Sequence, residues 1–531
     1  MQTNPTTPSP SPTHGRAVLR IVGLVGLVGV IGVALAARWY YGRRAHLTSE
    51  WRPLLGDHGT DVSLAGGISA GSMQLERLPE DAILLRLNGT APGDYFGWSV
   101  AGLGDVNDDG VPDVAVGAHQ LINAGERPNM NAPAGYVRAF SGADGSVLYT
   151  LQSKGSLNID SSDDMFGVSI AALDDIDADG HADIAVGSFL YDYEDADQSE
   201  VDENTGAVFI FSGATGEQVA LMGGERWGDR FGFCLDSIPD MDGDGLADLL
   251  VGVEKAETDR GVKNAGRVEI YSSATFERLV AANGPGWESR MGHSAIAMGD
   301  MDGDGIGDFA SGAYMFGARE DQGPQRGAVG IISGRTGEIL HGWEGAQMTD
   351  NLGKALASLG DLDGDGRNEI ALGATQSGLE GEHTGQYFGP GYVRIHSSVD
   401  GRLLDVLLGE TLGDQFGWTL ANIGDRNGDG ADDLLVGAPA SMTFLDKKLD
   451  RRGRIYLFSG ADRSLLKAFE GLELNDQFGA AAASIGDLDG DGLDEVLVGA
   501  PQNVSQQTEA GYAIIISGSA FAPSGTGDGP R

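Results

Sequence analysis

The sequence is poor in cysteine and in positive charge, and both shortages narrow the class of protein. Cys234 is the single cysteine among 531 residues, so no disulfide can form within the chain. It lies in an apolar strand pattern, where a buried and inert thiol is expected. Lys and Arg number 35 against 78 Asp and Glu, which gives a formal charge of −43. This charge argues against nucleic acid as a partner, because phosphate backbones are bound by clustered Lys and Arg.

Catalytic signatures are also missing. The nine histidines are scattered, and none lies in an HExxH pattern or in a setting typical of a catalytic triad. There is no G-x-S-x-G elbow and no phosphate-binding glycine loop. The sequence therefore predicts a protein that is not an enzyme.

Long hydrophobic runs are scarce, and the one that stands out lies near the N-terminus. Residues 21–37 are uncharged and are flanked by arginines, and counting from residue 18 gives about 20 residues, enough to cross a bilayer. We therefore predict a membrane anchor over residues 18–41, after a disordered tail at 1–17. A cleaved signal peptide is the alternative, because Ala34-Leu35-Ala36 offers a cleavage site. Residues 42–81 are predicted to be a linker.

What the sequence has in plenty is glycine, 85 residues of it, in a repeating pattern. The first copy has Phe96-Gly97, an acidic stretch from Asp105 to Asp113, and Val116-Gly117-Ala118. The acidic stretches open 60 to 70 residues apart, at Asp105, Asp175, Asp240, Asp300, Asp361, Asp425 and Asp487. A period above 50 residues with four short strands in each unit is typical of propeller blades.

The strand pattern supports a propeller. In the first unit, strands are expected over residues 98–103, 113–117, 135–140 and 146–151. The last unit has no fourth strand, whereas a spare strand at 82–87 precedes the first unit. Pairing the spare strand with the last unit would close the ring and remove two open sheet edges. The sequence thus predicts an all-β, seven-bladed β-propeller over residues 82–518 and a disordered tail over 519–531.

The repeat unit resembles a known family. Phe96-Gly97 through Val116-Gly117-Ala118, and Phe416-Gly417 through Val436-Gly437-Ala438-Pro439, are similar to the FG-GAP repeats of the integrin α-subunit propeller. Met291-Gly292 and Leu352-Gly353 depart from the FG pair. The resemblance implies a propeller that presents partners with the loops between its second and third strands. A stand-alone FG-GAP protein is implied rather than a heterodimeric receptor, because no inserted domain or leg domain follows.

Each acidic stretch has the form Asp-x-Asp-x-Asp-Gly-x-x-Asp, which suits one hard cation. Side-chain oxygens at positions 1, 3, 5 and 9 and a backbone carbonyl at position 7 can surround Ca²⁺, while the glycine at position 6 permits the sharp turn. Up to seven calcium ions are predicted. The expected ligands are Asp105, Asn107, Asp109, Val111, Asp113; Asp175, Asp177, Asp179, His181, Asp183; Asp240, Asp242, Asp244, Leu246, Asp248; Asp300, Asp302, Asp304, Ile306, Asp308; Asp361, Asp363, Asp365, Arg367, Glu369; Asp425, Asn427, Asp429, Ala431, Asp433; and Asp487, Asp489, Asp491, Leu493, Glu495.

Propeller topology predicts where partners would bind. The acidic loops should share one face with the hairpins between strands three and four, so that the opposite face carries the long, irregular loops. One of these, residues 189–205, is strongly acidic and is either a solvated loop or a site for a basic partner. The residues after the FG pairs either ring the mouth of the central channel or pack in the core: Trp98, Phe233, His293, Lys354 and Trp418.

These observations predict a calcium-binding, extracytoplasmic surface protein that acts in adhesion, in protein or glycan recognition, or in envelope scaffolding. The external location follows from calcium, because extracellular modules bind it at about 0.1 to 1 mM, far above cytosolic levels. The alternative is a carbohydrate-active hydrolase or lyase with a carboxylate pair on the face opposite the acidic loops.

Overall fold

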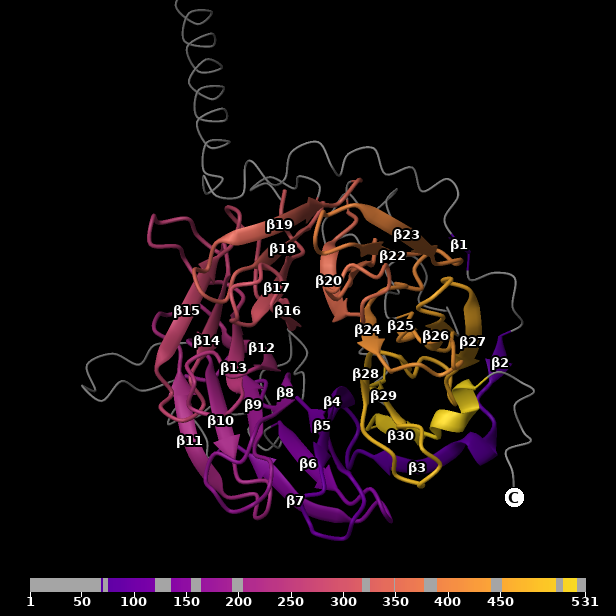
Figure 1. Cartoon of the computed structure of the whole chain (residues 1–531). Helices are drawn as coiled ribbons and strands as arrows, with labels where there is room; N and C mark the ends of the chain where they lie inside the picture. The colour runs from indigo at the N-terminus through magenta and orange to yellow at the C-terminus, as the bar shows by residue number, and fades with distance from the viewer. Residues whose placement is uncertain are drawn as a thin grey trace, which may run out of the picture.

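Seven blades, each an antiparallel meander of four strands, surround a central axis in the computed structural model (Figure 1), and two of the blades carry a short fifth strand at the rim. The structure describes residues 68–69, 75–119, 135–153, 164–192, 204–317, 325–347, 349–376, 389–440, 451–502 and 510–522. The prediction of an all-β, seven-bladed propeller is confirmed. The predicted anchor at 18–41 lies outside the described residues. Within them, no helix is both long and apolar enough to cross a bilayer.

Each blade is a meander whose first strand lies nearest the axis and whose fourth lies at the rim (Figure 1). Blade 1 consists of β4 (Phe96–Gly104), β5 (Asp113–Ala118), β6 (Tyr136–Phe140) and β7 (Val147–Gln152). Blades 2 and 3 consist of β8 (Ile170–Ala172), β9 (Ile184–Ser188), β10 (Ala207–Phe211), β11 (Gln218–Gly223), β12 (Phe231–Ile238), β13 (Asp248–Val253), β14 (Arg267–Tyr271) and β15 (Arg278–Asn283).

The remaining blades repeat this order. Blades 4 and 5 consist of β16 (Ser294–Gly299), β17 (Asp308–Ala313), β18 (Ala328–Ile332), β19 (Ile339–Glu344), β20 (Leu352–Ser358), β21 (Ile370–Ala374), β22 (Tyr392–His396) and β23 (Leu403–Leu408). Blades 6 and 7 consist of β24 (Thr419–Asn422), β25 (Leu434–Ala438), β26 (Arg454–Phe458), β27 (Leu465–Glu470), β28 (Ala481–Ser484), β29 (Val496–Ala500), β30 (Tyr512–Ile516) and β3 (Ile83–Asn88).

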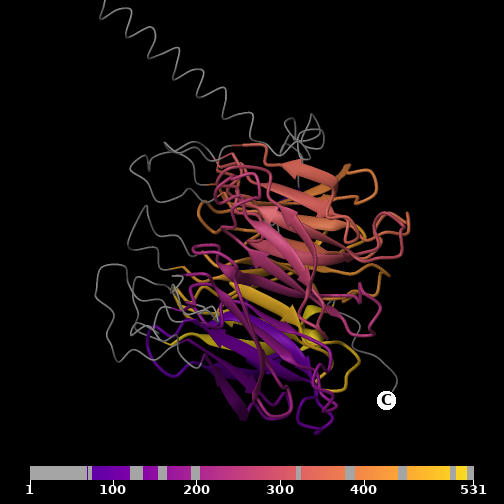
Figure 2. The ribbon, with the colours of Figure 1, turned by 90° about the vertical axis from the view of Figure 1, so that its left-hand side faces the viewer.

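The second strand of every blade is buried along its whole length, as β5 and β29 illustrate. Such strands read as continuous apolar runs because neighbouring blades cover both of their faces (Figure 2). The rim strands instead keep exposed positions, for example in β7. The core therefore lies in the wedges between blades rather than in one central cluster.

Ring closure occurs as the sequence predicts. The N-terminal strand β3 pairs antiparallel with β30 and supplies the rim strand of blade 7. Its Leu87 is buried among Phe96, Leu497 and Ile515, which belong to blades 1 and 7. Closure by a strand from the other end of the chain covers the edge of β30 that would otherwise be open at the rim.

Two glycines in every repeat explain the FG and VGA patterns. The second residue of each FG pair has positive φ, from 81° to 96°, which favours glycine. A Cβ on the glycine of a VGA stretch would collide with the carbonyl oxygen of the next blade's FG glycine, and Gly499 meets Gly97 in this way where the ring closes. Met291 and Leu352 replace the phenylalanine without loss because that position only needs a buried apolar side chain.

Two short strands lie within the predicted linker. β1 (Ile68–Ser69) pairs in parallel with β23 at the rim of blade 5, and β2 (Glu76–Arg77) pairs in parallel with β27 at the rim of blade 6. A 3₁₀ turn at Glu80–Ala82 then leads into β3, and a second one at Gly518–Phe521 follows β30. The chain before β3 thus runs along the rims of blades 5 and 6 before it closes blade 7.

Candidate metal sites and the opposite face

The seven acidic loops share one hydrogen-bond pattern. In each, the backbone N–H of the glycine at position 6 donates to the carboxylate at position 1, at N···O distances of 2.8 to 3.0 Å. The N–H at position 5 donates to the side chain at position 3, and the N–H at position 7 donates to the carboxylate at position 5. These bonds fold the loop tightly and turn the ligand side chains inward.

The carboxylate at position 9 fastens each loop to its blade. It is fully buried in all seven blades and accepts a hydrogen bond from the backbone N–H of position 2. In five blades it also accepts an N–H from the hairpin between strands three and four, as Asp113 does from Gly142 at 3.0 Å. In blade 7 the equivalent N–H comes from Gly518, just after β30. The acidic loops and these hairpins therefore lie on one face, as predicted, and we call it the acidic-loop face.

Electrostatics separates the two ends of each loop. Burial raises the pKa of Asp248 and Asp433 to about 6, although backbone N–H groups oppose the shift. Burial likewise raises the pKa of Glu369 to about 7. Backbone hydrogen bonds from Gly243 and Gly245 instead lower the pKa of Asp240, which lies in the open part of its loop. A bound cation would offset the cost of keeping the buried carboxylates ionised.

Oxygen atoms converge in the loops. In blade 7, one oxygen from each of Asp487, Asp489, Asp491 and Glu495 lies within 4.8 Å of the other three. Four further loops gather three carboxylates in the same way, through Asp175, Asp177, Asp183; Asp240, Asp242, Asp248; Asp300, Asp302, Asp304; and Asp361, Asp363, Asp365. Hard carboxylate oxygens at these spacings are the ligands that calcium prefers.

One buried atom tests this fit independently. Oε1 of Glu369 is buried and has no hydrogen-bond partner, because blade 5 lacks the second backbone N–H bond that the position 9 carboxylate accepts in the other six blades. A buried carboxylate oxygen without a partner is costly, and a cation in the loop would satisfy it. The donor set of the blade 5 loop therefore fits a metal ion.

Two loops carry a competing cation. Arg335 contacts Asp304 at 2.6 Å in blade 4, and Arg402 contacts Asp363 at 2.6 Å in blade 5. Both guanidinium groups come from the neighbouring hairpins and are more than half exposed. Because each occupies an oxygen that a metal would use, the seven loops are not equivalent.

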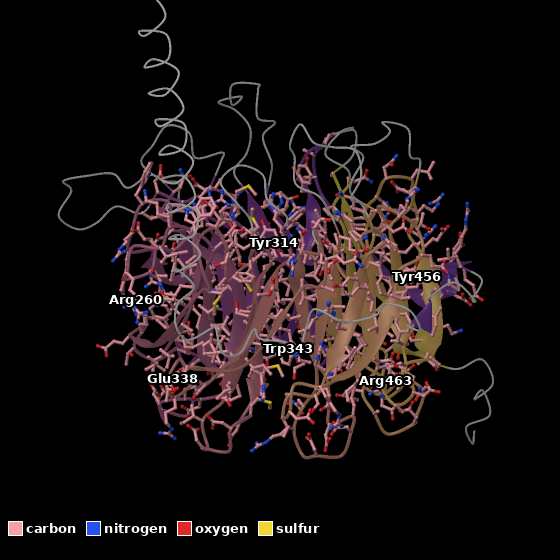
Figure 3. The ribbon with its side chains drawn as sticks, turned by 90° about the horizontal axis from the view of Figure 1, so that it is seen from above. Arg260, Tyr314, Glu338, Trp343, Tyr456 and Arg463 are labelled. Carbon is pink, nitrogen blue, oxygen red and sulfur yellow. The ribbon has the colours of Figure 1, made fainter. Side chains whose placement is uncertain are left out.

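Figure 3 shows the two faces of the ring from the side. Tyr314, which follows β17, lies toward one face, whereas Glu338 and Arg463, from hairpins between strands three and four, lie toward the other. The face of Tyr314, opposite the acidic loops, is called the opposite face. Of the predicted acidic loop at 189–205, the structure describes residues 189–192 and 204–205, which adjoin β9 and β10, and residues 193–203 fall outside the described residues.

The residues after the FG pairs meet one another on the opposite face. The rings of Phe233 and His293 lie 4.8 Å apart, Lys354 Nζ lies 2.7 Å from His293 Nε2, and the same amine lies 4.2 Å from the centre of the Trp418 ring. Four of the five predicted positions thus form a continuous chain across blades 3 to 6. Trp98 lies against His119 instead, with ring centres 4.5 Å apart.

Sequence reasoning missed the centre of this group. Glu254 follows β13, is 1% exposed, and lies 3.2 Å from His293 Nδ1 and 2.8 Å from Arg230. Although burial alone would raise it, these cationic and hydrogen-bonding neighbours lower the pKa of Glu254 to about 2. The available signal was that this blade has an acidic residue at the position where the other six blades have none; they have His119, Phe189, Tyr314, Thr375, Pro439 and Pro501 there.

Comparison with known proteins agrees with this geometry. The FG-GAP repeat model matches residues 96–143, 353–393, 416–458 and 478–516, and an FG-GAP-like repeat model matches residues 240–311. Integrin alpha-8 of Gallus gallus is 32% identical over 173 residues, which cover 32% of this chain and 15% of that protein. Integrin alpha-7 of Homo sapiens is 37% identical over 171 residues, which cover 31% of this chain and 13% of that protein. Integrin alpha-IIb of Homo sapiens is 44% identical over 104 residues, covering 18% and 10%.

The fold and its seven acidic loops define a propeller of the repeat type seen in these matches. The chain carries FG-GAP repeats, and its propeller resembles the integrin α-subunit N-terminal β-propeller. The matched segments span less than a fifth of the length of each of these integrin subunits.

Proposed function

We propose that the chain is a calcium-binding, extracytoplasmic propeller that mediates adhesion or recognition of a protein ligand, tethered through residues 18–41. The observation that carries the proposal is the convergence of four carboxylates in the blade 7 loop, whose sequence pattern recurs in the same register in the other six blades. Similarity to integrin α subunits supports a recognition role. The alternative carbohydrate-active enzyme has no support from these relatives.

Calcium would act structurally in this proposal. The side chains at positions 1, 3, 5 and 9 would hold the ion, which would supply positive charge between carboxylates that otherwise repel. Filling seven loops with divalent ions would change the formal charge from −43 to about −29. A site held at a hundred times its dissociation constant adds about 2.7 kcal/mol to the free energy of unfolding.

Ligand recognition would use the opposite face. The acidic-loop face is committed to holding the loops and hairpins together, whereas the opposite face carries the connections between second and third strands. Glycans and envelope scaffolding remain further candidates for this face, and the formal charge of −43 argues against nucleic acid as a partner.

The test is thermal unfolding of the purified protein in millimolar calcium and after chelation, together with metal analysis. We expect several bound calcium ions and a melting temperature that falls on chelation. The variant Asp491→Asn should lose about one bound ion and lower the melting temperature in calcium. Its matched control is Asp494→Asn, an exposed carboxylate at position 8 of the same loop, which should change neither quantity. A protein without bound metal that is indifferent to chelation contradicts the proposal.

A further inference from the structure

The connection into every blade contains a residue with an unusual backbone. The residue before each FG position has positive φ in all seven blades: Tyr95, Met165, Arg230, Arg290, Asn351, Gln415 and Gln477. Left-handed backbone suits glycine and asparagine, and other side chains there carry strain of about 1 kcal/mol or more. Arginine occupies this position in blades 3 and 4, with φ of 62° and 55°.

The same two connections share a longer pattern. Trp227-Gly228-Asp229-Arg230 leads into blade 3, and Trp287-Glu288-Ser289-Arg290 leads into blade 4. No other connection pairs a tryptophan with an arginine three residues later. Trp227 is 66% exposed, the highest value among the large apolar side chains of the described residues. An exposed tryptophan beside arginine is the composition typical of binding hot spots.

Both arginines converge on one buried carboxylate. Arg230 lies 2.8 Å and Arg290 lies 3.8 Å from Glu254, and the two arginine side chains keep 24% and 22% of their surface exposed. The carboxylate therefore holds the arginines in place while leaving them accessible. A pre-positioned guanidinium loses little conformational entropy when it binds an anion.

Lys354 adds a third cation through His293. A lysine ammonium can only donate, so it donates to Nε2 of His293, and the Nδ1–H of that ring donates to Glu254. The amine also lies over the rings of Trp418 and Tyr314, at 4.2 and 5.3 Å. These aromatic rings are thus occupied by a cation of the chain itself.

The charges of this cluster do not cancel. Arg230, Lys255, Arg290 and Lys354 face two carboxylates, Glu254 and Glu288. Burial lowers the pKa of Lys255, and Arg230 and Arg290 lower it further against the opposing effect of Glu254 and Glu288. Such an excess is exceptional on a chain whose formal charge is −43.

We propose that this cationic cluster, at the junction of blades 3 to 5 on the opposite face, binds a carboxylate side chain of an acidic and aromatic segment of a protein partner. The proposal rests on the recognition function proposed above and names the chemistry of the ligand. Arg230 and Arg290 would pair with the carboxylate, and Trp227 would pack against the adjoining apolar residue.

The test measures binding of labelled peptides to the full chain in detergent, by fluorescence anisotropy with millimolar calcium. The probes are a short peptide of Glu, Gly and Phe and its analogues with Gln or Lys in place of Glu. We expect the Glu peptide to bind at least about tenfold more tightly than the Gln peptide, a difference of about 1.4 kcal/mol in binding free energy. Added salt should weaken the binding of the Glu peptide. Equal binding of the Glu and Gln peptides, or preference for the Lys peptide, overturns the proposal.

Variants locate the site. Arg290→Gln and Lys354→Gln should each weaken binding of the Glu peptide about tenfold. The matched control is Arg463→Gln, an arginine with φ of 63° on the acidic-loop face, which should leave binding unchanged. The melting temperatures of all three variants show whether each one folds. If Arg290→Gln does not fold, Lys354→Gln still tests the proposal. If Arg463→Gln weakens peptide binding to the same extent, the attraction is non-specific and the proposed site is wrong.

Two further outcomes separate the hypotheses. Hyaluronate carries the same carboxylate group on a sugar. If hyaluronate binds more tightly than the Glu peptide, and if Arg290→Gln abolishes that binding, the proposal of a protein partner is overturned. If calcium raises the melting temperature but the Glu peptide does not bind, this inference fails while the proposed metal function stands. If chelation changes nothing, the proposed metal function fails whichever peptide binds.

Discussion

At the scale of single residues, side chains at equivalent backbone positions make different contacts in different blades. The residue after each FG glycine is Trp98 in blade 1, His293 in blade 4 and Lys354 in blade 5. The repeat fixes where such a side chain begins, and the neighbouring blade decides what it contacts. His293 is neutral because burial and Lys354 lower its pKa to about 4, so it bridges an amine and a carboxylate without adding charge.

Asp236 provides a residue-scale prediction about pH. It lies on β12 and accepts hydrogen bonds from Ala297 of the next blade and from Ser237, yet burial raises its pKa from 3.8 to about 6. The native carboxyl keeps its proton up to about pH 6, whereas the unfolded one loses it near pH 4. Asp236 therefore lowers the free energy of unfolding as pH rises between these values, and the loss is complete above them.

We expect Asp236→Asn to raise the free energy of unfolding at pH 7 by about 2 kcal/mol, less than full desolvation implies because the side chain keeps some exposure. The gain should vanish below about pH 4, where both states are protonated. Denaturant unfolding at pH 4 and pH 7 measures it, with the exposed Asp81→Asn as the control that should show no gain. A gain of equal size at both pH values would contradict this account.

At the scale of elements, ring closure depends on β3. This strand covers β30, which is buried along its whole length and would otherwise be an open apolar edge. Within the described residues, the segment before it adds the two-residue pairings of β1 and β2 and the buried side chains of Leu78 and Ala82. We therefore expect the two parts of the N-terminal segment to differ sharply in importance.

A matched pair of truncations tests this difference. A chain that begins at residue 75 keeps β2 and β3 and should remain monodisperse with a modest decrease in melting temperature. A chain that begins at residue 90 lacks β3 and should aggregate, because the edge of β30 can pair with another molecule. Size-exclusion chromatography in millimolar calcium is the measurement. A folded, monomeric chain beginning at residue 90 would show that the closing strand is dispensable.

At the scale of the whole molecule, self-repulsion opposes the fold. A formal charge of −43 destabilises a compact state, and salt screens that repulsion. After chelation, we expect the melting temperature to rise by several degrees as sodium chloride is raised from low to high concentration. In calcium the rise should be smaller, because bound ions already neutralise part of the charge. Equal salt dependence in both conditions would mean that calcium does not act through charge.

The sequence by itself determined the architecture. The period of the FG and VGA glycines, the four short strands in each unit and the spare strand before Phe96 were enough to predict seven blades and the closing strand. The glycines work as signals because each one marks a point where two blades touch too closely for a side chain. The acidic loops could also be recognised from the sequence, because their acidic side chains lie at fixed spacing within one segment.

Only the tertiary structure decided the rest, because it depends on contacts between segments far apart in the chain. The rim pairings of β1 and β2 carry no periodic signal, since two residues in a parallel pairing need only backbone groups. The cluster around Glu254 joins residues from four blades that are about 60 residues apart in sequence. The sequence placed Phe233, His293, Lys354 and Trp418 at equivalent positions, and the ring geometry brought them together.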